Sequence, residues 1–184
     1  MIATRSELIG FIKAAFGNVS RQGGVSWTET EVLDMYGSDA ERATARKKDT
    51  DQRWTELIDG DGFRECGIGG FCFLDPIGFR YYLPAAICIS LTKRLDVAFT
   101  PNSLDFHFQT DSNVRPRNME LFDEAQLRAI AEYLWFQFAE SEWGRQSDGS
   151  YIYLEDIDPE LVTLSFQTSL QEVPAFWRQF LTPV

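Results

Sequence analysis

Three cysteines and one histidine are the residues best suited to bind a metal or act as a nucleophile. Cys66, Cys72 and Cys88 are separated by five and fifteen residues, so no Cys-x-x-Cys unit exists, and His107 is the only histidine. A zinc site needs about four thiolate or imidazole ligands, and this spacing does not favour one. We therefore expect reduced, buried cysteines, no metal, and no catalytic role for His107.

Two further patterns resemble ligand loops only superficially. Asp59 and Asp61 flank Gly60 as in a calcium loop, but the twelfth position, which must hold a bidentate acid, is Gly70. The glycine-rich stretch 67–70 is not followed by the Lys-Ser/Thr of a phosphate loop, and no serine lies in a Gly-x-Ser-x-Gly elbow. The sequence therefore predicts a protein that is not an enzyme and that has no cofactor.

Acidic residues gather near the C-terminal end. The chain has 28 acidic and 17 basic residues, a net charge of −11, and its acidic segment 140–160 has only Arg145 as a base. Acids surrounding aromatic anchors suit a basic protein partner, because charge speeds the encounter and aromatic rings supply binding energy. Helix N-termini also attract acids, and negative surfaces favour solubility, so either effect is an alternative explanation for the acidic segment. The candidate partner-binding residues are Glu140, Glu142, Trp143, Asp148, Tyr151, Tyr153, Glu155, Asp156, Asp158 and Glu160.

The same charge balance limits the classes of partner and the compartment. A nucleic-acid binder needs clustered Lys and Arg, and so does an electrostatic membrane anchor, so we expect neither function. The uncharged run 81–92 is too short to cross a bilayer as a helix. Residues 1–17 contain charges that interrupt any secretory leader. Together with the reduced cysteines, these features predict a cytoplasmic protein.

Short helices are expected in the first third of the chain. A Thr-x-x-Glu capping box opens a helix over residues 4–16, and Thr28 with Glu31 opens a second helix that ends at Gly37. The charged run 38–48 has few apolar residues, so it is either a solvated helix or a mobile connection.

The middle of the chain is the most apolar part. Asp75-Pro76 predicts a helix start because aspartate caps free amides and proline suits the first helical position. We expect this helix to end near Tyr82, since Pro84 disfavours a helical conformation before it, and a buried central helix to cover 85–94. The alternation Leu104, Phe106, Phe108 predicts one short strand or an extended loop. Further helices are expected over 123–143 with one apolar stripe, from Asp158-Pro159, and over 172–181. The fold class is mainly α, a single compact helical domain over residues 1–184 with at most a minor hairpin or edge strand.

One block resembles a known family. Phe73-Leu74-Asp75-Pro76 followed by the run 79–85, Phe-Arg-Tyr-Tyr-Leu-Pro-Ala, is similar to the signature of a bacterial family of small proteins of unknown function. The resemblance extends over most of the chain and implies a helical fold without an established activity, cofactor or catalytic residue. Small acidic cytoplasmic proteins of this kind are associated with toxin–immunity loci.

Two functions follow as expectations. The first is a non-enzymatic binding protein, an immunity-type inhibitor that masks a basic surface of a toxin or other effector through the segment 140–160. The second is a small-molecule-binding or enzymatic domain with a pocket around Arg80, Tyr81 and Tyr82, although the same block is also typical of a fold-defining core corner. A deep polar pocket at that block would favour the second function, and a flat acidic face at 140–160 the first.

Overall fold

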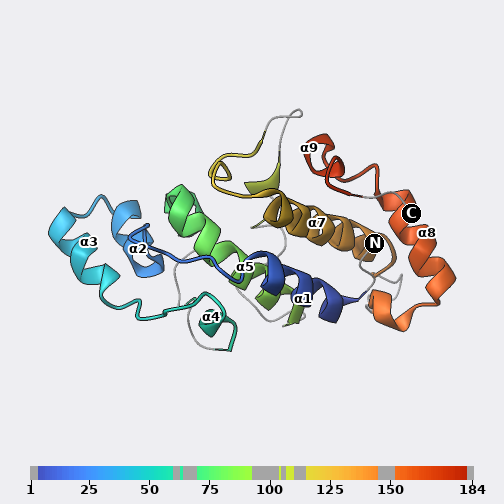
Figure 1. The fold of residues 1–184 in the computed structure, drawn as a ribbon, viewed down its shortest axis with the longest axis horizontal. Coiled ribbons are helices and arrows are strands. Elements are labelled where there is room, and N and C mark those ends of the chain that lie inside the picture. The colour runs from blue at the N-terminus through green and yellow to red at the C-terminus, as the bar shows by residue number, and fades with distance from the viewer. Residues whose placement is uncertain are drawn as a thin grey trace. The chain divides into compact units, whose positions relative to one another are not determined.

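The computed structural model describes residues 4–59, 63, 70–92, 104, 107–109, 115–144 and 152–181, apart from the side chains of residues 142–144. The described part is mainly α-helical and contains no strand, which confirms the predicted fold class (Figure 1). None of its helices is both long enough and apolar enough to cross a membrane. The elements are α1 (Arg5–Ala15), α2 (Trp27–Asp34), α3 (Asp39–Arg46), α4 (Glu56–Asp59), η1 (Gly70–Phe73), α5 (Pro76–Thr92), α7 (Glu124–Gly144), η2 (Leu154–Asp156), α8 (Pro159–Ser169) and α9 (Ala175–Arg178).

The chain groups into two compact units, which we describe separately. Unit 1 comprises residues 1–15, 109–115 and 123–184, and unit 2 comprises residues 16–108 and 116–122. The single domain over residues 1–184 stays a prediction.

Unit 1 is built around α7. Asp123 caps this helix, because its Oδ1 accepts a hydrogen bond from Gln126 N at 2.9 Å, as the sequence predicts. The predicted apolar stripe is buried from Leu127 to Trp135, but burial extends beyond it, since α7 is buried continuously from Ala129 to Phe136. The reason is that α1, α8 and α9 all pack against it. A helix covered by several neighbours needs apolar side chains around most of its circumference.

The helices around α7 begin largely where the sequence predicts. Thr4 Oγ1 accepts from Glu7 N at 3.2 Å at the start of α1, and Asp158 Oδ1 accepts from Glu160 N at 2.9 Å at the start of α8. Polar bonds then join α8 to α7, where Trp135 Nε1 donates to the carbonyl of Phe166 at 2.7 Å. The expected helix over 172–181 is shorter, because only α9 is helical after Pro174.

Unit 2 has α5 as its buried helix. The predicted burial of residues 85–91 is confirmed for all of them except the half-buried Ser90. The predicted break at Pro84 is wrong, because α5 runs through it without interruption. An interior proline costs a helix about 3 kcal/mol. The helix accommodates that cost because nearly every side chain from Phe79 to Leu91 is buried, which far outweighs it.

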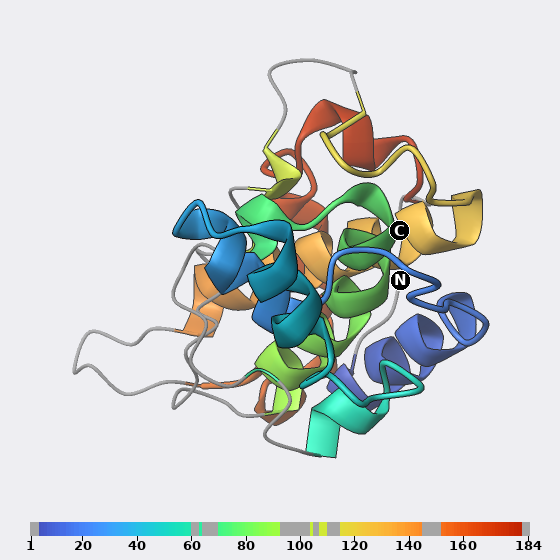
Figure 2. The same ribbon diagram turned by 90° about the vertical axis from the view of Figure 1, so that its left-hand side faces the viewer.

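Two other predictions for unit 2 need correction, and one alternative left open there is decided. The second capping box consists of Ser26 and Glu29, because Thr28 is instead bonded to a distant carboxylate and α2 begins at Trp27. Of the two alternatives for the charged run 38–48, the solvated helix is confirmed, because the run contains the largely exposed α3, which lies beside α2 in both views (Figures 1 and 2).

The expected strand is also wrong at Leu104, His107 and Phe108, which are helical, while Phe106 lies outside the described residues. Among the cysteines, Cys88 is buried as expected, Cys72 is exposed because it lies in the short η1 turn, and Cys66 lies outside the described residues.

Candidate functional site

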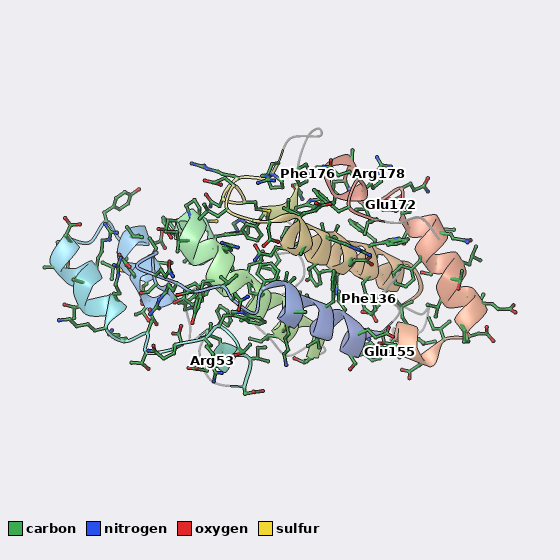
Figure 3. All side chains as sticks on the ribbon, viewed as in Figure 1. Arg53, Phe136, Glu155, Glu172, Phe176 and Arg178 are labelled. Atoms are coloured by element: carbon green, nitrogen blue, oxygen red, sulfur yellow. The ribbon has the colours of Figure 1, made fainter. Side chains whose placement is uncertain are left out.

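Arg5 organises the beginning of the acidic segment in unit 1. Its guanidinium is bonded to the carboxylates of Glu140 and Glu155, and its backbone N–H donates to Glu155 Oε1 at 3.0 Å. The guanidinium carbon also lies 4.7 Å from the ring centre of Tyr153, within the range of a cation–π contact. Figure 3 shows Glu155 near one end of α1. Three of the candidate partner-binding residues therefore make intramolecular contacts with one arginine.

Glu140 is the most buried member of this Arg5 cluster. It is 6% exposed, and burial raises its pKa although the Arg5 guanidinium and the Leu154 N–H, which donates to Glu140 Oε1 at 3.4 Å, act in the opposite direction. These contacts hold η2 against α7 and α1. The structure thus gives Glu140 a role in positioning the acidic segment rather than a place on its surface.

Four acids among the described residues of the segment are exposed, and one of them, Glu155, is bonded to Arg5. Asp156, Asp158 and Glu160 are exposed, and Asp158 is also the cap of α8. Glu142 and Trp143 belong to the last turn of α7, but their side chains, together with Asp148 and Tyr151, lie outside the described part.

Exposed apolar side chains lie beside these acids, and sequence reasoning missed them. Ile152, Leu161 and Leu164 are between 36% and 43% exposed. Leu161 and Leu164 are three residues apart on α8 and so lie on one side of the helix, whereas Val162 and Phe166 are buried. The sequence signal was available, because a helix that buries Val162 and Phe166 must turn Leu161 outward. We call the exposed set the η2–α8 face: Ile152, Asp156, Asp158, Glu160, Leu161 and Leu164.

The tyrosines of the resembling block form a second polar cluster, in unit 2. The Tyr82 hydroxyl accepts from Arg21 Nη1 at 2.6 Å and from Trp27 N at 3.0 Å. The Tyr81 hydroxyl donates to Asp51 Oδ2 at 2.7 Å. Burial, reinforced by the Asp51 carboxylate, raises the pKa of both tyrosines, so that both stay protonated. These bonds attach the start of α2 and the loop around Asp51 to α5.

Two neighbours complete this attachment. Asp49 accepts from Thr28 N at 2.8 Å and from Thr28 Oγ1 at 2.7 Å. A Cβ on Gly78 would lie 2.4 Å from the Val25 carbonyl oxygen, so only glycine lets the segment at Val25, just before α2, lie this close to α5. Arg80 is partly exposed and contributes none of these bonds. The tyrosine hydroxyls and Gly78 therefore behave as parts of a core corner.

A third polar cluster lies between α2 and α3. Glu29 is 1% exposed and accepts from Ser26 N at 3.2 Å, Arg42 Nε at 3.1 Å and Arg46 Nε at 2.9 Å. Burial by itself would raise the pKa of Glu29, but these donors outweigh it and hold the pKa below its ordinary value. A hollow of about 400 Å³ opens beside this cluster. We call it the α2–α3 hollow, and it is lined by Glu29, Asp39, Arg42, Ala43, Arg46 and Lys47.

The comparisons with known proteins now identify the group to which this chain belongs. A family of unknown function, DUF6714, matches residues 4–179. The chain belongs to the DUF6714 family. No curated protein and no solved structure matches the sequence.

The match includes all three polar clusters of this DUF6714 chain. It also agrees with the expectation of a helical family without an established activity. Function must therefore be argued from the surfaces of the DUF6714 chain itself.

Proposed function

We propose that this DUF6714 chain is a non-enzymatic binding protein whose η2–α8 face docks onto a basic protein. Its further proposed role is that of a cytoplasmic immunity-type inhibitor, which masks the basic surface of a toxin or other effector. The observation that carries the proposal is the exposure of Asp156, Asp158 and Glu160 beside Leu161 and Leu164. Buried Glu140 and Arg5-bonded Glu155 hold this face in place instead of belonging to it.

The two kinds of side chain have separate tasks in such an interface. Exposed carboxylates act over a distance of about 8–10 Å at ordinary salt and raise the association rate with a basic partner. Exposed leucine and isoleucine side chains act only after docking, when water leaves them, and therefore slow dissociation. This division is testable because it assigns each residue to a different rate constant.

The pocket around Arg80, Tyr81 and Tyr82 receives no comparable support. Both hydroxyls are bonded inside unit 2, and both tyrosines are fully buried. A ligand there would have to displace bonds that already join α5 to α2, so we do not propose that function.

Co-purification with the products of neighbouring genes, followed by binding kinetics at two salt concentrations, tests the proposal. We expect Asp156→Lys to lower the association rate, and expect this effect to shrink at high salt. Leu161→Ala should raise the dissociation rate, and a loss of about 2 kcal/mol or more would make Leu161 a main anchor.

The matched control is Glu172→Lys, which makes the same change in net charge at an exposed position beyond the opposite end of α8 (Figure 3). The proposal would be overturned if binding to the captured partner did not depend on salt and if Asp156→Lys and Leu161→Ala changed the rate constants no more than Glu172→Lys does.

A further inference from the structure

The α2–α3 hollow is a positively charged site on a strongly acidic chain. Its lining has three cationic side chains, Arg42, Arg46 and Lys47, and two carboxylates, Glu29 and Asp39, whereas the whole chain has a net charge of −11. The hollow's volume of about 400 Å³ falls within the roughly 300–1,000 Å³ of small-molecule sites. Surface charge selected only for solubility would not place three cations around one depression of this chain.

Glu29 fixes the orientation of both guanidinium groups. Arg46 approaches it with Nε at 2.9 Å and Nη2 at 3.0 Å, and Arg42 approaches it with Nε at 3.1 Å. The two arginines are four residues apart on α3, so they extend from the same side of the helix. A carboxylate that holds arginines in this way removes much of the entropy that they would otherwise lose on binding a ligand.

The held groups keep donor capacity for a ligand. Arg46 bonds to Glu29 through Nε and Nη2, and its Nη1 makes no bond to any residue that the structure describes. The Lys47 ammonium is exposed and likewise makes none within the described ranges. Glu29 already accepts bonds from both arginines, and Asp39 is 99% exposed, so neither carboxylate occupies these remaining donors.

We propose that the α2–α3 hollow binds an oxyanion, namely the phosphate or carboxylate group of a small molecule. Arg46 Nη1, which Glu29 leaves unbonded, can donate to an oxygen of either group, and Lys47 adds a point charge at the rim. The site lies in unit 2 and the η2–α8 face lies in unit 1, so the oxyanion proposal can be tested independently of the proposed function.

The experiment is an amide-resonance titration of the full chain by nuclear magnetic resonance. Sodium phosphate and sodium acetate are added in separate arms, each against sodium chloride at the same ionic strength. We expect saturable shifts of the α3 amides, residues 42–47, in at least one of the two oxyanion arms. The arm with the tighter binding identifies the group. The proposal would be overturned if sodium chloride shifted the α3 amides as much as phosphate and acetate do.

Two exposed lysines provide a matched pair of variants. Lys47→Glu places a carboxylate at the rim of the hollow and should weaken oxyanion binding by about tenfold or more, equivalent to about 1.4 kcal/mol. Lys48→Glu makes the same change in net charge at the next residue, which does not line the hollow, and should change the affinity less than about twofold. Equal losses of oxyanion affinity in the two variants would show a general effect of charge and would contradict the proposed site.

A third variant tests the geometry of the guanidinium. Arg46→Lys keeps the positive charge beside Glu29 but removes the planar fork. We expect weaker oxyanion binding by about fivefold to tenfold, with thermal unfolding measured alongside to show that the chain stays folded. Unchanged affinity would contradict the proposal, because Arg46 Nη1, which a lysine lacks, is a donor on which it depends.

Discussion

Glu29 in unit 2 and Glu140 in unit 1 are both buried carboxylates that bond to arginine, and their pKa values are shifted in opposite directions. Glu29 in unit 2 is 1% exposed and its pKa is lowered, whereas Glu140 in unit 1 is 6% exposed and its pKa is raised. Burial is the largest influence on both and raises the pKa of both. Burial acts in the same direction on both carboxylates, so the opposite directions also require opposing contributions from the neighbouring groups.

The donors and charges around each carboxylate supply these contributions. Glu29 accepts bonds from two arginines and from the Ser26 amide, which together favour the ionised form. Glu140 has Arg5, which it shares with Glu155, and the negative charge of Glu155 opposes its ionisation. The comparison teaches that two arginines and a backbone amide together hold the pKa of a buried carboxylate low, even though Arg42 also pairs with Asp39, whereas one arginine shared with a second acid does not.

The largest expected effect is the loss of the Glu29 charge. Glu29→Gln should lower the free energy of unfolding by about 3 kcal/mol, because two arginines then lose a buried anionic partner. Urea denaturation measures this change. The matched control is Glu31→Gln, an exposed position on the same helix, which should change the free energy by less than about 0.5 kcal/mol. Similar changes in the free energy of unfolding for Glu29→Gln and Glu31→Gln would show that the buried ion pairs of Glu29 contribute no special stability.

The loss caused by Glu29→Gln should depend on pH. Because the folded pKa of Glu29 is lowered, the unfolded chain binds more protons at acidic pH. The stability that Glu29 contributes is therefore fully present above its unfolded pKa and is lost as the pH falls through its folded pKa. Wild type and variant should accordingly converge in acid.

The second and smaller effect concerns Arg5. Arg5→Met should lower the free energy of unfolding by about 2 kcal/mol near neutral pH, less than the loss expected for Glu29→Gln because Glu140 can take up a proton. The raised pKa of Glu140 means that the folded chain binds more protons than the unfolded chain, so this group's contribution falls as the pH rises from its unfolded towards its folded pKa. Removing Arg5 raises the folded pKa further.

Urea denaturation at about pH 5 and about pH 7.5 checks this dependence, and the Arg5→Met loss should be smaller at the lower pH. Lys13→Met, at an exposed position of the same helix, is the control and should show no such trend. An equal loss at both pH values would mean that Glu140 remains charged as Glu29 does, and the contrast between the units would disappear.

Local patterns in the sequence predicted much of the fold, since helix starts depend on neighbouring residues. The caps at Thr4, Asp123 and Asp158 are of this kind. The break expected at Pro84 was wrong, because burial of α5 by distant segments overrides local preference.

The candidate site depends on contacts that no local pattern contains. Glu140 and Glu155 are interpreted as exposed acids in the sequence, but both bond to Arg5, which is more than a hundred residues away. The pairing of Glu29 with Arg42 and Arg46 is likewise invisible until α2 and α3 lie side by side. The arginine contacts of Glu29 and Glu140 could therefore be recognised only in the folded chain.

The turn between α2 and α3 offers a further way to sharpen the account of unit 2. Tyr36 follows the end of α2 with φ of 56°, in the left-handed region that glycine prefers, and its side chain is 96% exposed. Gly37 N donates to the Val32 carbonyl at 2.8 Å and Tyr36 N to the Leu33 carbonyl at 3.1 Å, which is the pattern of a Schellman ending. A tyrosine at this position strains the backbone and buries almost nothing in return.

Tyr36→Gly should therefore raise the free energy of unfolding, by about 0.5–1 kcal/mol. Relief of the left-handed strain contributes about 1–2 kcal/mol, and the greater freedom of glycine in the unfolded chain offsets part of it. If the Glu29 ion pairs hold α3 on α2 independently of this turn, the same gain should appear in the Glu29→Gln background, within about 0.5 kcal/mol. Urea denaturation of the two single variants, the double variant and the wild type measures this coupling. If Tyr36→Gly no longer raised the free energy of unfolding once Glu29 is replaced, the turn would form only because the ion pairs bring α3 onto α2. The stability assigned to Glu29 would then have to include that of the turn.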